Sequence, residues 1–241
     1  FYLTLNSPFF WDGASNILVE VSYDGNPSEL GIAALGEASN LNAIASIGNN
    51  KFVRFDGNDE IRIPASAFAS ISNEITIAFW LRGDANAQPE NGTTFEARNS
   101  SNNRVLNAHL PWSNSRVYWD AGNSGGAYDR IDKAANPADY EGVWNHWAFT
   151  KNTVTGEMKA YLNGVLWHSG TGKVFPMTSI TQFSIGSAST WSNFYRGDID
   201  DFTIFSSELN DAEIQNIYIG GPSDPSLLVQ YNFNNDSNGA V

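Results

Sequence analysis

The residues best suited to binding chemistry lie between positions 93 and 133, with one more in a later loop. Side chains alternate along a strand, so the short apolar-polar patterns here predict strands with one apolar face and one polar face. The predicted polar face carries Glu96, Arg98, Asn107, His109, Tyr118, Asp120, Tyr128 and Arg130. Two tryptophans in predicted loops, Trp112 and Trp191, could provide flat apolar surfaces beside it.

This mixture of side chains suits a saccharide. Carboxylates, amides and guanidiniums can bind sugar hydroxyls through directional hydrogen bonds, and the C–H faces of a sugar ring can lie on aromatic rings. The sequence therefore predicts a carbohydrate-binding face. A plainer interpretation stays open, in which these arginines and Arg116 only form ordinary cross-strand ion pairs with Glu96 and Asp120 on a solvated surface.

Composition excludes several other partners. The 241 residues include 13 Lys+Arg and 26 Asp+Glu, for a net charge of −13. This charge argues against nucleic acid and against an anionic membrane surface, and it favours a neutral glycan over an anionic one. No apolar run reaches the ~18 residues that span a bilayer. The absence of cysteine excludes a disulfide framework, a thiolate zinc site and a cysteine nucleophile.

The elements that must position the polar face are almost all strands. Segments rich in β-branched and aromatic residues, bounded by turn-forming residues, predict strands at 16–23, 51–55, 60–63, 74–82, 93–98, 104–110, 116–121, 128–133, 144–151, 157–162, 165–169, 180–186, 197–205 and 227–233. One helix is predicted over 211–218, capped by Asn210 and ended by Gly220. The pattern predicts an all-β, two-sheet sandwich with one short C-terminal helix, and with Trp144, Trp147 and Phe149 in its core.

Five motifs occur in order along the chain. They lie at 51–63 (with Phe-Asp-Gly), 75–80, 144–150 (Trp-Asn-His-Trp-Ala-Phe-Thr), 158–164 (ending Leu-Asn-Gly), and 197–205 (with Ile-Asp-Asp-Phe) followed by 209–214. Together they resemble the laminin-G-like domains of the concanavalin A-like lectin/glucanase superfamily, of the bacterial extracellular kind. The resemblance implies an antiparallel jelly-roll sandwich. It restricts function less, because this fold carries lectins, adhesion modules, receptors and hydrolases.

The resemblance also implies a structural calcium ion, because many relatives carry one on the rim of the sandwich. Calcium binds hard oxygen ligands. Carried over by motif, the ligands would be Asp24, Asp56, the carbonyl of Gly57, Asn58 and Asp201. The alternative is that Asp56 and Asn58 only form a turn.

Catalytic motifs known from this fold are missing. Its glucanases carry Glu-x-Asp-x-x-Glu on one strand, which places carboxylates on one face at about 5–5.5 Å, as retaining glycoside hydrolysis needs. That triplet does not occur, and neither do the Gln-x-His strand of jelly-roll alginate lyases or the Gly-x-Ser-x-Gly and His-Glu-x-x-His motifs. The histidines at 109, 146 and 168 are too scattered to predict a metal triad. We therefore expect no enzymatic activity.

These observations predict a non-catalytic, lectin-like module of a larger secreted or surface-attached extracellular protein. Its partners would be a glycan and other domains of the same polypeptide. The alternatives are an adhesion or spacer module without a sugar site, and a polysaccharide hydrolase or lyase. We expect a lead-in strand or the end of an upstream module over 1–26, the sandwich over 27–221, and a linker and strand over 222–241. That last strand either opens a following module or completes this sandwich.

Overall fold

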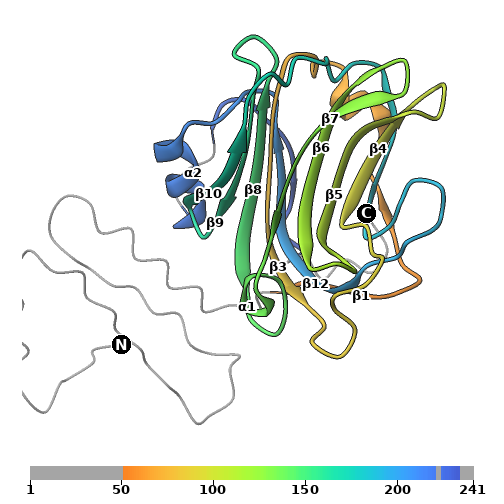
Figure 1. The fold of residues 1–241 in the computed structure, drawn as a ribbon, viewed down its shortest axis with the longest axis vertical. Coiled ribbons are helices and arrows are strands. Elements are labelled where there is room, and N and C mark those ends of the chain that lie inside the picture. The colour runs from red at the N-terminus through yellow and green to blue at the C-terminus, as the bar shows by residue number, and fades with distance from the viewer. Residues whose placement is uncertain (1–50, 221–223, 234–241) are drawn as a thin grey trace, which may run out of the picture. The chain divides into compact units, whose positions relative to one another are not determined.

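Residues 51–220 and 224–233 are described by the computed structural model, and they form two antiparallel β-sheets that pack face to face (Figure 1). The seven-stranded sheet has the spatial order β1 (Val53–Asp56), β12 (Arg196–Phe205), β3 (Glu74–Gly83), β8 (Asn145–Asn152), β9 (Glu157–Leu162) and β10 (Val165–Gly170), with β13 (Leu227–Tyr231) also paired to β12. The six-stranded sheet has the order β2 (Ile61–Arg62), β11 (Ile180–Ile185), β4 (Phe95–Asn99), β5 (Arg104–Trp112), β6 (Arg116–Ser124) and β7 (Ala127–Ala134). This architecture confirms the predicted jelly-roll sandwich.

The strand predictions within the described residues are all matched by strands whose ends differ by three residues or fewer. The predicted strand at 16–23 lies outside the described residues. Helix α2 (Asp211–Tyr218) has the predicted bounds, and the side chain of Asn210 accepts hydrogen bonds from the backbone N–H groups of Ala212 and Glu213. A single turn, α1 (Pro137–Tyr140), and a 3₁₀ turn (Ala65–Phe68) were not predicted, because one turn is too short to produce a helical period.

The core consists of the apolar side chains that alternate along both sheets and meet between them. Phe79 and Phe202 stack with ring centroids 5.2 Å apart, and Trp147 and Phe149 are fully buried, as predicted. The prediction for Trp144 was wrong. This residue precedes β8 and is only half-buried on the outer side of the seven-stranded sheet.

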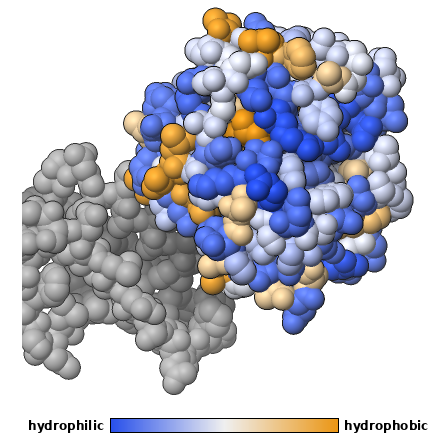
Figure 2. Space-filling view, viewed as in Figure 1, coloured by the Kyte–Doolittle hydropathy of each residue, from blue (hydrophilic) through white to orange (hydrophobic). Residues whose placement is uncertain are grey.

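The two outer faces of the sandwich differ. Helix α2 covers part of the outer face of the seven-stranded sheet, where Ile214 packs in a cluster with Ala78, Ala148 and Tyr161. The small alanines leave room for the helix. Figure 2 shows hydrophobic atoms gathered around α2 and β10, whereas hydrophilic atoms predominate over β6 and β7. The outer face of the six-stranded sheet is therefore the one that remains for polar chemistry.

The chain after α2 returns to the same sandwich. Strand β13 pairs antiparallel with β12, with Val229 opposite Ile204 and Gln230 opposite Thr203. Residues 227–231 thus form part of the seven-stranded sheet. The predicted boundary between 26 and 27 and the residues 234–241 lie outside the described residues. Within the described part of the chain, no helix is long and apolar enough to cross a membrane.

Candidate functional site

The strand register places four predicted site residues in one row across the six-stranded sheet. Glu96 on β4 lies opposite Asn107 on β5, Asn107 lies opposite Asp120 on β6, and Asp120 lies opposite Arg130 on β7. Ser184 on β11 continues the row beyond Glu96. Period-two alternation therefore places these side chains on one face, as the sequence predicts.

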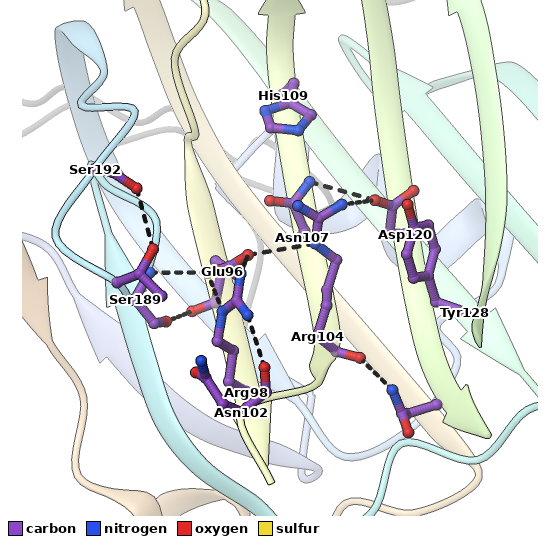
Figure 3. A network of polar contacts seen from close by, with 12 residues as sticks. Glu96, Arg98, Asn102, Arg104, Asn107, His109, Asp120, Tyr128, Ser189 and Ser192 are labelled. Carbon is purple, nitrogen blue, oxygen red and sulfur yellow. Dashed lines mark hydrogen bonds and ion pairs between the residues drawn. The ribbon is translucent and has the colours of Figure 1, made fainter. Parts of the chain in front are cut away.

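Two buried carboxylates organise this face (Figure 3). The side chain of Glu96 is 0 % exposed and accepts hydrogen bonds from Nε and Nη2 of Arg98 at 2.8 and 2.9 Å. The side chain of Asp120, also 0 % exposed, accepts from Nε and Nη2 of Arg130 at 2.6 and 2.8 Å. Both arginines reach toward the surface. The ion pairs of the plainer interpretation are therefore present, but their carboxylates are removed from solvent.

Arg104 joins these two ion pairs and was not among the predicted site residues. Its Nε lies 3.3 Å from Glu96 Oε1, and its Nη1 donates to Asp120 Oδ2 at 2.7 Å. Strict alternation from Leu106 would turn Arg104 into the core. A register shift between β4 and β5 leaves Val105 as an extra residue, so Arg104 lies opposite Arg98 on the polar face. No signal in the sequence marks this bulge.

Tyrosine rings lie against the guanidinium groups. The Cζ atom of Arg130 is 4.7 Å from the ring centroid of Tyr118 and 5.2 Å from that of Tyr128. The Cζ atom of Arg104 is also 5.2 Å from the Tyr128 ring. Such cation–π contacts contribute about 0.5–1 kcal/mol each when exposed. Tyr128 is 37 % exposed, so its ring is accessible to a ligand beside both arginines.

His109 and Trp112 extend the face along β5. The ring of His109 is 6 % exposed, and its Nδ1 lies 2.8 Å from the carbonyl oxygen of Gly92. Burial lowers the pKa of His109 to about 4, so the ring is neutral at physiological pH. A carbonyl only accepts, so Nδ1 carries the proton and Nε2 is left as an acceptor. The half-buried Trp112 ring lies 4.4 Å from the His109 ring.

The loop 186–195 adds contacts that the sequence did not predict. The backbone N–H of Ser189 donates to Glu96 Oε2 at 2.9 Å, and its hydroxyl donates to the Glu96 carbonyl oxygen at 2.9 Å. The loop thereby fixes Glu96. Trp191, two residues further on, is 57 % exposed and contacts Phe194 at 5.1 Å between ring centroids. Arg116 lies outside the network, because it pairs with Asp132.

The calcium ligands that the resemblance implies lie at different points along the length of β12. Asp56 lies opposite Arg196 and accepts a hydrogen bond from it through the backbone oxygen, and Gly57 and Asn58 follow in the same turn. Asp201 lies five residues beyond Arg196, about 16 Å at the usual rise of a strand. No group of three or more His, Asp or Glu residues able to hold a metal occurs within 51–220 and 224–233. Asp24 lies outside those ranges, and calcium binding stays a prediction.

Comparison with known proteins decides the family. The sequence profile of the concanavalin A-like lectin/glucanases superfamily, laminin-G type, matches residues 55–215. The chain belongs to this superfamily. No curated protein sequence matches the chain.

Solved structures with the same fold include binding domains of toxins and one domain of an arabinanase. The receptor-binding domain of a botulinum neurotoxin C/D mosaic is similar with a TM-score of 0.56 and 19 % identity, covering 69 % of this chain and 42 % of that chain. The botulinum neurotoxin D ligand-binding domain in complex with N-acetylneuraminic acid gives 0.55 and 20 %, covering 68 % and 40 %. Domain 4 of an extracellular arabinanase from Geobacillus stearothermophilus, in complex with arabinotriose, gives 0.53 and 22 %, covering 69 % and 76 %. This chain thus spans about two fifths of the toxin chains, and these identities establish only the fold.

The two buried carboxylates of the polar face are not accessible to a ligand. A general acid or base must reach the substrate directly or through one water. Glu96 and Asp120 have no exposed side-chain surface, and arginines occupy their oxygens. The exposed groups include guanidinium N–H donors, aromatic rings and the carboxylate of Asp132. This arrangement can hold a polar, ring-bearing ligand in a fixed orientation.

Proposed function

We propose that this domain is a non-catalytic glycan-binding module whose ligand lies on the outer face of the six-stranded sheet. One observation carries the proposal. Two fully buried carboxylates fix three arginines, two of which lie against tyrosine rings, at a surface that no helix of the described residues covers. The position of each donor and each ring is set before a ligand arrives, which reduces the ordering cost of binding.

The energetics support a binding role over a purely structural one. Removing two carboxylates from water costs several kcal/mol each, and ion pairing only roughly offsets that cost. An outer face that served only solubility would keep its charges solvated, as most surface ion pairs are. Burial of Glu96 and Asp120 gives little stability in return. It does fix the direction of Arg98, Arg104 and Arg130.

The ligand class is supported by two similar structures. One is a toxin domain in complex with N-acetylneuraminic acid and the other an arabinanase domain in complex with arabinotriose. Both are under 25 % identical to this chain, so they support a saccharide ligand in general but give neither the sugar nor the contact residues. The neighbours are also parts of longer proteins, which fits a module that directs a larger extracellular protein to a glycan.

Saccharide arrays followed by isothermal titration calorimetry test this function. The full chain should bind at least one saccharide at millimolar concentration or below. Tyr128→Ala should weaken that binding about tenfold, the effect of losing an aromatic contact of about 1.4 kcal/mol. Phe52→Ala is the matched control, because Phe52 is 41 % exposed and contacts Trp144 on the seven-stranded sheet instead.

Three results would contradict the proposal. Absence of binding to every saccharide at millimolar concentration would leave the adhesion or spacer module as the better interpretation. A loss with Phe52→Ala equal to that with Tyr128→Ala would move the site away from this face. Release of reducing ends or unsaturated products from a bound polysaccharide would show an enzyme.

A structural calcium ion is tested separately, since EDTA should lower the Tm of the full chain if one is bound.

A further inference from the structure

The three arginines at the centre of the proposed glycan-binding face present only hydrogen-bond donors to a ligand. The side chains of Arg98, Arg104 and Arg130 are 19, 22 and 35 % exposed, whereas those of Glu96 and Asp120 are 0 % exposed. The two carboxylates that hold these arginines are thus out of reach of a ligand. A sugar hydroxyl donates hydrogen bonds as well as accepting them. A ligand group that only accepts hydrogen bonds would therefore use the donors of this face more fully than hydroxyl groups alone.

Two of these guanidiniums converge on a single atom. Arg104 Nη1 and Arg130 Nη2 both donate to Asp120 Oδ2, at 2.7 and 2.8 Å. Their nitrogens are therefore no more than 5.5 Å apart, the sum of these two distances. Tyr128 lies over both, at 5.2 Å from each Cζ atom. The shared carboxylate holds the two cationic groups side by side.

Each of the two guanidiniums keeps one nitrogen unused. Within the described part of the chain, Nη2 of Arg104 and Nη1 of Arg130 donate to no acceptor, while their other nitrogens bond to Glu96, Asp120 or Tyr128. Each free nitrogen carries two N–H groups. These free nitrogens belong to two guanidiniums that meet at the same oxygen of Asp120, so one acidic group of a ligand has a donor on either side of it.

The local charge has the sign that such a ligand needs. The network contains three guanidiniums and two carboxylates, which leaves an excess of one positive charge. His109 adds no charge, because burial keeps its ring neutral. The next charged pair on the face, Arg116 with Asp132, is balanced. The accessible centre of the face is thus cationic within a chain whose net charge is −13.

We propose that the glycan bound here carries an anionic group, a carboxylate or a sulfate ester, which bridges Arg104 and Arg130 beside the ring of Tyr128. This inference rests on the proposed glycan-binding function and names its ligand class. Net charge alone favours a neutral glycan, since a long-range field of −13 repels anions. At ionic strengths near 0.15 M this field is screened beyond about 8 Å. The contact itself is then decided by the local donors, which form charge-assisted hydrogen bonds.

The test compares polymers that differ only in charge. Polygalacturonate is compared with its fully methyl-esterified form, and dextran sulfate with dextran, by affinity electrophoresis and calorimetry on the full chain. We expect the charged member of at least one pair to bind tenfold or more tightly than its neutral partner, and its affinity to fall as NaCl rises from 50 to 500 mM. Preference for polygalacturonate identifies a carboxylate, and preference for dextran sulfate identifies a sulfate.

A variant locates the contact. Arg130→Lys keeps the charge but loses the planar fork, and it should weaken binding of the charged polymer about tenfold. Arg54→Lys is the control, because Arg54 makes a comparable paired contact with Asp198 on the other sheet. If neutral and charged polymers bind equally, the inference is wrong while the glycan-binding function stands. If no saccharide of any kind binds, the proposed function fails too. The polymer comparison on the unaltered chain decides the inference even if Arg130→Lys does not fold.

Discussion

Replacement of Asp120 by asparagine should destabilise the domain far more than the same change at Asp132. Both residues are aspartates of the six-stranded sheet that pair with arginine, on neighbouring strands. Asp120 has no exposed surface and accepts from Arg104 and Arg130 at 2.6–2.8 Å. Asp132 is 31 % exposed and pairs with Arg116, which is 39 % exposed. The substitution keeps the side-chain shape and removes one charge.

The expected cost follows from these contacts. Asparagine keeps a single acceptor oxygen and turns an NH₂ group toward a guanidinium, so donors face donors. Breaking a buried ion pair costs about 3–5 kcal/mol, and the partial exposure of Arg104 and Arg130 lets water replace part of what they lose. We therefore expect Asp120→Asn to lower the free energy of unfolding by about 2–4 kcal/mol. Asp132→Asn, a surface pair, should cost at most about 1 kcal/mol.

Urea unfolding followed by circular dichroism and tryptophan fluorescence measures both values, and coincident transitions test the two-state assumption. For a domain of this size, the expected loss of unfolding free energy corresponds to a fall in Tm of roughly 5–12 °C for Asp120→Asn. For Asp132→Asn the fall in Tm should be less than about 4 °C. Equal, small losses in both variants would refute the reasoning. They would mean that solvent, rather than the buried carboxylate, supports the arginines.

Three further predictions test other parts of the structure. Burial lowers the pKa of both His109 and His146 to about 4, whereas an unfolded histidine protonates near 6.5. Protonation of the unfolded chain should thus lower stability as the pH falls from about 6.5 toward 4, and NMR should show both rings neutral at about pH 5. Gly122→Ala should lower the free energy of unfolding by well over about 1 kcal/mol, because the φ of Gly122 is +82° and the new Cβ would lie 2.1 Å from a backbone oxygen. Gly125→Ala, at φ +60° with open space around it, should lower the free energy of unfolding by about 1 kcal/mol. Asn210→Ala removes the cap of α2 and should cost about 1 kcal/mol in urea unfolding, and no loss would contradict the capping role.

Alternation and turn chemistry were enough to predict most of this fold. Strands such as Glu74–Gly83 are long, β-branched and bounded by turn residues, so local pattern and tertiary packing agree. The helix Asp211–Tyr218 was predicted because its cap is a local sequence signal. Trp144 was misassigned because its neighbours Trp147 and Phe149 are core residues. Its position, three residues before Trp147, gives it the outward parity of His146, so strict alternation along the predicted strand already places it outside the core.

Alternation also predicted most of the residues of the polar face, but it missed some of them. Period two assigns Asn107 and Asp120 to one side of the sheet without knowledge of which strands are neighbours. It cannot assign Arg104, because the bulge at Val105 reverses the alternation and leaves no mark in composition. It also cannot find Ser189, since that contact joins residues 93 positions apart in the chain. Long-range pairing and register irregularities are tertiary facts.

The missing residue changes the chemistry of the face. Without Arg104, Glu96 and Asp120 would each serve one arginine in a separate, balanced ion pair, and the face would have no net charge. With Arg104 between them, both carboxylates are shared, and the extra guanidinium contributes the positive charge and one of the two free nitrogens. One irregular residue in β5 therefore converts a set of cross-strand ion pairs into a cationic centre. The preference for charged or neutral glycans measures that conversion directly.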